Sequence, residues 1–147
     1  MKLKQLSLFL ENSPGALSRP VRLLAQAGCN ILTLSIDDTS QFGILRLILR
    51  DWEAARDLLE KNGLVVKVTD MVAVGVADEP GGLAAVLDVL EQAGLNVEFV
   101  YPLTVKQGGR AVLVFRFADP DGAIRILQQR GVNVISGADA LNGGWAD

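Results

Sequence analysis

Two short loops carry the residues whose types and spacing could do chemistry. They hold Asn12, Ser13, Pro14, Gly15, Ala16 and Leu17, and the similar run Asp78, Glu79, Pro80, Gly81, Gly82 and Leu83. Each loop stands between an alternating apolar segment and an amphipathic one, which predicts a strand leading into a helix. The first N–H groups of a helix are unpaired and lie at the positive end of its dipole, where a carboxylate is favoured. We therefore expect both loops to be candidate sites for a small carboxylate.

The two loops differ in the polar residues that would face such a ligand. Asn12 offers donors and acceptors, which suit an α-ammonium and an α-carboxylate together, and Gly15 leaves room for close approach. Asp78 and Glu79 would repel a carboxylate unless they bind its ammonium group. Alternatively, Asp78 could only cap its helix. The first loop is therefore expected to be the better site and the second the weaker one.

The sequence offers little other chemistry. It contains no histidine, which removes the usual general base near neutral pH and the commonest metal ligand. The single cysteine, Cys29, has no histidine partner to activate it. Neither a P-loop nor a dinucleotide fingerprint is present. We expect no catalytic residue, no metal site and no cofactor, which indicates a protein that is not an enzyme.

Composition and charge narrow the class of partners. Of the 147 residues, 50% are hydrophobic and 21% charged, which is typical of a packed soluble protein. The net charge of −3 provides no cationic surface for a phosphate backbone, so no nucleic-acid partner is expected. The longest uncharged stretch, residues 23–36, is shorter than the roughly 20 apolar residues of a membrane span. A lone cysteine fits a reducing compartment, and we expect a cytoplasmic protein without membrane contact.

The two loops belong to an internal repeat. A shift of 66 residues carries the first loop onto the second and gives eight identities over the 20 positions 12–31. Later in the chain the shift is 68, which pairs Gly63 with Gly131. Such self-similarity indicates two homologous domains, which we place at residues 1–70 and 71–147.

Each repeat is predicted to run strand, helix, strand, strand, helix, strand. Apolar residues at helical spacing predict an amphipathic helix over 81–93, and Asp51 and Asp119 are expected to cap the second helix of each repeat. Pro20 lies inside the first helix, so we expect a kink or an irregular first turn there. Each helix is expected to end at a left-handed glycine: Gly28, Gly63, Gly94 and Gly131. This order predicts an α+β fold, a ferredoxin-like sandwich in two tandem copies with both helices on one sheet face.

Two motifs recur in both repeats at the same spacing. They are Asn12-x-Pro14-Gly15-x-Leu17 with Gly28-x-Asn30-Ile31, and Asp78-x-Pro80-Gly81-x-Leu83 with Gly94-x-Asn96-Val97. This pattern resembles the ACT domain, a regulatory amino-acid-binding module, and the two copies cover nearly the whole chain. A structural alternative stays open, because Pro-Gly is also a common helix start and Gly-x-Asn a common helix end.

The resemblance implies where a ligand would lie. In ACT assemblies the amino acid lies where the loop meets the second strand of a neighbouring domain. On the strand side, the resemblance implies contacts from Asn30, Ile31 and Leu32, and for the second site from Asn96 and Val97.

The resemblance also implies a function. It suggests an amino-acid sensor acting in trans on a regulated partner protein, similar to the tandem-ACT repressor type of the glycine cleavage system. The alternative is a ligand-free assembly module with the ACT fold. A homodimer is expected because the helix-free sheet faces should carry exposed apolar residues: Phe9, Ile44, Ile48, Val112 and Val114. Arg110 flanks a Gly-Gly turn and is expected to be a solvated hairpin end.

Overall fold

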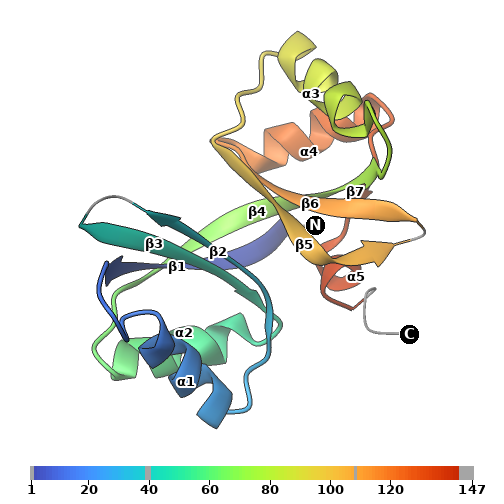
Figure 1. The fold of residues 1–147 in the computed structure, drawn as a ribbon. Helices are drawn as coiled ribbons and strands as arrows, with labels where there is room; N and C mark the ends of the chain where they lie inside the picture. Colours follow the sequence, from blue (N-terminus) through green and yellow to red (C-terminus); the bar gives the residue numbers. More distant parts are fainter. Residues whose placement is uncertain (1, 39–40, 108, 143–147) are drawn as a thin grey trace. The chain divides into compact units, whose positions relative to one another are not determined.

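A computed structural model describes residues 2–38, 41–107 and 109–142 of the chain. This part holds seven strands and five helices (Figure 1). In chain order they are β1 (Lys2–Glu11), α1 (Ser18–Gln26), β2 (Ile31–Asp38), β3 (Phe42–Leu49), α2 (Trp52–Lys61), β4 (Val66–Ala77), α3 (Gly82–Gln92), β5 (Phe99–Gln107), β6 (Arg110–Arg116), α4 (Pro120–Gln129), β7 (Val134–Ile135) and α5 (Gly137–Asn142).

The chain divides into two compact units. The amino-terminal unit comprises residues 4–69, and the carboxy-terminal unit comprises residues 70–147 together with residues 1–3. The sequence prediction assigned residues 1–3 to the first domain, whereas the structure groups them with the later unit.

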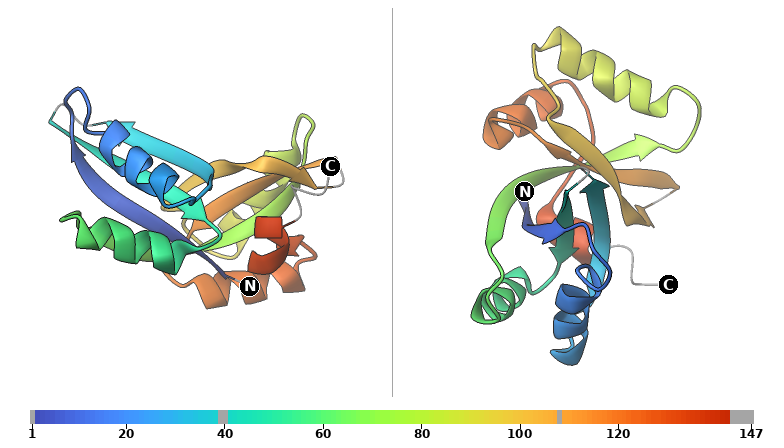
Figure 2. Two further views of the ribbon diagram at one scale, coloured as in Figure 1. Left: turned by 90° about the horizontal axis from the view of Figure 1, so that it is seen from below. Right: turned by 60° about the vertical axis from the view of Figure 1, so that its left-hand side comes forward.

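In the amino-terminal unit the sheet order is β2-β3-β1-β4, with β1 and β2 both antiparallel to β3. The register places Leu8 opposite Leu45 and Leu6 opposite Leu47. These four leucines are fully buried in one core cluster that also includes residues of α1 and α2. The alternating apolar residues therefore face the two helices, which lie on one face of the sheet (Figure 2).

The carboxy-terminal unit repeats this order as β5-β6-β4-β7. Its core joins Val74 of β4 and Phe115 of β6 to Leu90 of α3 and Leu127 of α4. Both units are therefore ferredoxin-like βαββαβ sandwiches, which confirms the predicted fold class. The short helix α5 follows β7 and was not expected from the repeat.

The second helix of each unit begins at the predicted aspartate. Asp119 occupies the N-cap of α4, and its carboxylate accepts a 3.1 Å hydrogen bond from the N–H of Gly122. Asp51 occupies the N-cap of α2 without a side-chain capping bond. The glycines expected at the helix ends all have positive φ, between +71° and +84°: Gly28, Gly63, Gly94 and Gly131.

Pro20 is the third residue of α1, which begins only at Ser18. Residues 14–17 form turns ahead of it. The expected irregular first turn is thus confirmed. A proline is tolerated here because the first N–H groups of a helix have no intrahelical partner.

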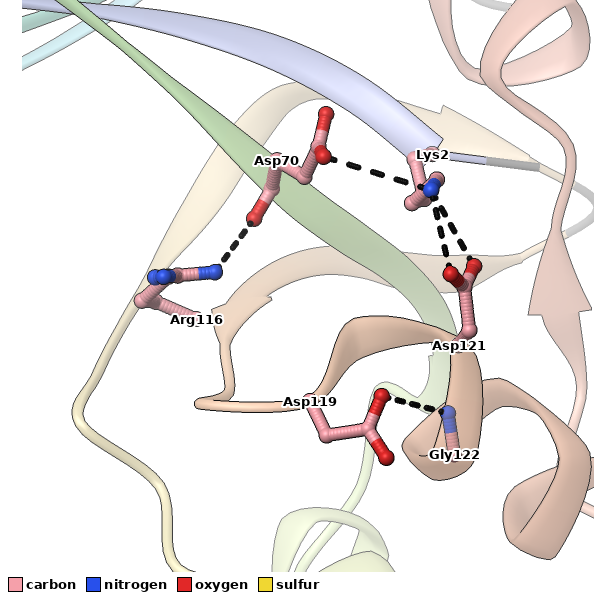
Figure 3. A network of polar contacts seen from close by, with 6 residues as sticks. All are labelled: Lys2, Asp70, Arg116, Asp119, Asp121 and Gly122. Atoms are coloured by element: carbon pink, nitrogen blue, oxygen red, sulfur yellow. Dashed lines mark hydrogen bonds and ion pairs between the residues drawn. The ribbon is translucent and has the colours of Figure 1, made fainter.

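Residues near the N-terminus are tied to the carboxy-terminal unit by charge (Figure 3). The Nζ of Lys2 lies 3.1 Å from Oδ1 of Asp121 in α4 and 4.0 Å from Oδ2 of Asp70. The hydrogen bond to Asp121 and the charges of both carboxylates raise the pKa of Lys2 above its ordinary value. Arg116 adds a hydrogen bond from Nη1 to the carbonyl oxygen of Asp70.

The expected exposed apolar sheet faces are only partly present. Phe9 is 67% exposed, but Ile48, Val112 and Val114 are buried and provide no apolar surface for a partner. The argument for a homodimer from these three residues is therefore wrong at the level of surface exposure.

Candidate functional site

The first loop lines a pocket of about 280 Å³ in the amino-terminal unit. Four of the predicted ligand residues line it: Asn12, Ser13, Ala16 and Leu17. Ile36 of β2 and Gly43 of β3 belong to the same lining and were not predicted. The hairpin register could have revealed them, because Gly43 pairs with Leu10 immediately before the loop.

The backbone of this loop supplies two unpaired N–H groups. The N–H of Ala16 already donates to the carbonyl oxygen of Ser13 at 3.2 Å, so it is not available to a ligand. Within residues 2–38, 41–107 and 109–142, no hydrogen-bond acceptor pairs with the N–H of Gly15 or of Leu17. These two groups stand ahead of α1 and are candidate donors to a carboxylate.

Gly15 is required by the backbone conformation and not by crowding. Its φ is +85°, a left-handed conformation that L side chains rarely adopt. A Cβ added to it would have no neighbour within 4 Å. The residue lines a neighbouring pocket that it shares with Phe9 and Arg19, while Pro14 lies in the turn itself.

The strand residues implied by the ACT resemblance lie away from this pocket. Ile31 opens β2 and pairs with Leu49, at the end of the hairpin opposite to Gly43. Leu32 is buried and Asn30, just ahead of the strand, is exposed. The amino-terminal unit does not bring these three residues to its own loop.

The second loop lines an equivalent pocket of about 450 Å³ in the carboxy-terminal unit. Predicted and strand residues line it together: Asp78, Glu79, Pro80, Leu83, Ala111 and Leu113. Asn96 and Val97, which precede β5, are not part of this lining, and Val97 packs against the core. In both units, the pocket therefore joins the loop to the central hairpin strand.

The second loop is tighter than the first. Gly81 is the N-cap of α3 with a φ of +86°, and a Cβ on Gly82 would overlap the carbonyl oxygen of Ala77. Ala16 holds the place of Gly82 in the first repeat, where α1 has not yet begun. The two loops thus share a motif but differ in backbone path.

The described residues contain no group of three or more His, Cys, Asp or Glu side chains that could hold a metal ion. Cys29 is half-buried. None of the helices in the described part of the chain is long and apolar enough to cross a membrane.

Solved structures with the same fold cover nearly the whole chain. Protein BT0572 from Bacteroides thetaiotaomicron is 34% identical, with a TM-score of 0.89 and coverage of 97% of each chain. The ligand-free regulatory subunit of aspartate kinase from Thermus thermophilus is 17% identical, with a TM-score of 0.63 over 88% of this chain and 93% of that one. At this identity the second likeness shows the fold alone.

A third solved chain, a putative glycine cleavage system transcriptional repressor, is 15% identical with a TM-score of 0.40, covering 92% of this chain and 98% of that one. No curated protein matches the chain. The family model of the ACT domain pair matches residues 1–142. With two ferredoxin-like units, each carrying the Pro-Gly loop, the chain belongs to the ACT domain pair family.

Proposed function

We propose that this protein is a small amino-acid-binding regulator without enzymatic activity of its own, and that its first loop is the main ligand site. The observation that carries this proposal is the 280 Å³ pocket in which Asn12 stands beside the unpaired N–H groups of Gly15 and Leu17. Membership of the ACT family supports it, because that fold is linked to amino-acid-dependent regulation.

In this proposal the ligand carboxylate accepts hydrogen bonds from the N–H groups of Gly15 and Leu17. Asn12 orients the polar head, since its amide both donates and accepts. Leu17 and Ile36 provide apolar walls for the ligand side chain. Strand residues of a neighbouring domain, Asn30 to Leu32 or their counterparts Asn96 and Val97, close the pocket.

The regulatory output is proposed to act in trans. The domain pair accounts for residues 1–142, so ligand binding would change how the protein docks on another protein. The second loop, with Asp78 and Glu79 in place of Asn12 and Ser13, is proposed to be the weaker site for a carboxylate.

Isothermal titration of the chain with each of the 20 amino acids tests this function. We expect at least one amino acid to bind, and its binding to require the first loop. Absence of binding by every amino acid would contradict the proposed function.

A ligand-free assembly module is the second candidate. Exposed apolar side chains along the β2 edge favour it: Leu17 is 39%, Leu34 46% and Ile36 47% exposed. In that case light scattering would report a homodimer with or without amino acids, and Leu34→Asp would produce a monomer.

A further inference from the structure

A separate pocket of about 410 Å³ lies on the β7 side of the second loop. Three polar side chains line it, those of Glu79, Arg110 and Asn133, and the α3 residues Val86 and Val89 add an aliphatic wall. Within the described ranges, none of these three polar side chains makes a hydrogen bond or an ion pair. The pocket therefore offers one cation, one anion and one amide to a ligand.

The corresponding place in the amino-terminal unit has different chemistry. The repeat puts Phe42 where Arg110 stands and Val65 where Asn133 stands, and these two are 51% and 81% exposed. The pocket there is of similar size, about 450 Å³, but Arg19 reaches across to donate a 2.7 Å hydrogen bond to the carbonyl oxygen of Asn62. The polar set is thus specific to the carboxy-terminal unit.

Gly75 allows the Asn133 amide to hold its place in the pocket. The N–H of Gly75 donates to the carbonyl oxygen of Asn133 at 2.9 Å. A Cβ on Gly75 would lie 2.7 Å from Nδ2 of Asn133, so any larger residue would displace the amide. The first repeat has Phe9 at this position.

We propose that this pocket binds an aliphatic α-amino acid. Arg110 and Asn133 would hold the carboxylate, for which a guanidinium is well matched in charge and shape. Glu79 would hold the ammonium group, and Val86 and Val89 would contact the aliphatic side chain. Asp78 and Glu79 repel a plain carboxylate, so a zwitterion is favoured over a fatty acid of the same shape.

This site goes beyond the proposed function, because it lies on another face of the second loop and does not depend on Asn12. Titration of the full chain with leucine, isoleucine and valine tests it. We expect at least one to bind, and 4-methylpentanoate, which is leucine without its ammonium group, to bind at least tenfold more weakly than leucine.

Two variants address the polar groups directly. Arg110→Gln and Asn133→Val should each weaken binding at least tenfold, whereas Arg125→Gln, which removes an exposed charge from α4 outside the pocket, should not. Gly75→Ala is a milder test, because only the flexible end of Asn133 has to move. Circular dichroism melting of each variant checks that the fold is retained.

The outcomes separate this site from the first loop. Binding that survives Asn12→Asp but is lost in Arg110→Gln supports the site proposed here. Binding that is lost in Asn12→Asp but survives Arg110→Gln and Asn133→Val overturns it and leaves the proposed function standing. Equal binding of leucine and 4-methylpentanoate, or no binding of any of the three amino acids, also overturns it.

Discussion

Asn12 and Asp78 occupy the same place in the two repeats but differ by one negative charge. Each lines a pocket beside the loop that leads into the first helix of its unit. A carboxylate approaching the first loop meets a neutral amide, whereas at the second it meets Asp78 followed by Glu79. This single position therefore decides which orientation of an amino acid each loop accepts.

Asn12→Asp should weaken amino-acid binding at the first loop, because it places like charge beside the ligand carboxylate. Asn12→Ala should weaken it by about 1–3 kcal/mol, the scale for losing a hydrogen bond to a charged group. Isothermal titration measures both effects. Gln92→Glu adds the same charge in the other unit and should leave the affinity unchanged. If Asn12→Asp binds as well as the unaltered chain, the proposed ligand orientation is wrong.

At the scale of elements, Pro20 determines where the first helix begins. α1 begins at Ser18, whereas α3 begins at Gly82, the counterpart of Ala16. The later start leaves residues 14–17 in turns, and the N–H groups of Gly15 and Leu17 are left unpaired there. The element boundary thus produces the donors that the proposed ligand would use.

The two capping aspartates should differ in their effect on stability. Asp119→Ala should destabilise the protein by about 0.5–2 kcal/mol, because its carboxylate accepts from the N–H of Gly122 at the start of α4. Asp51→Ala is the matched control, since Asp51 has the same N-cap position on α2 but no side-chain capping bond. Urea denaturation measures both, and an equal loss of stability would show that the capping bond contributes nothing.

At the scale of the whole molecule, the chain begins in one unit and continues in the other. Leu3 is 2% exposed and belongs to the carboxy-terminal unit, where it lies close to Gly137 at the start of α5. Leu3→Ala should cost about 2–5 kcal/mol, the usual range for a buried leucine. Hydrogen exchange should show the loss of protection in β6 and α4 before β3 and α2. The reverse order would contradict the assignment of residue 3.

The ion pair of Lys2 should make the stability of the carboxy-terminal unit depend on alkaline pH. The folded pKa of Lys2 lies above its unfolded value, mainly because of the hydrogen bond to Asp121. Its contribution is therefore fully present below the unfolded pKa, about 10.4, and is lost as pH rises through the folded pKa. The Tm difference between the unaltered chain and Lys2→Met should shrink between about pH 9 and about pH 12. A constant difference would contradict this.

The sequence by itself determined the repeat, the order of elements, the helix ends and the capping aspartates, because each depends on neighbours within a few residues or on a period along the chain. It also indicated the ACT loop. It did not indicate that Ile36 and Gly43 join that loop, because a pocket lining depends on hairpin register.

Only the tertiary structure decided which groups are free and which are already used. Ala16 donates within its own turn, Val112 and Val114 are buried, and Asn133 lies over Gly75 from a strand 58 positions later in the chain. Such contacts join residues distant in sequence, and no local pattern encodes them. The physical reason is that hydrogen-bond partners and burial are properties of the packed chain, whereas propensity and periodicity are properties of a segment.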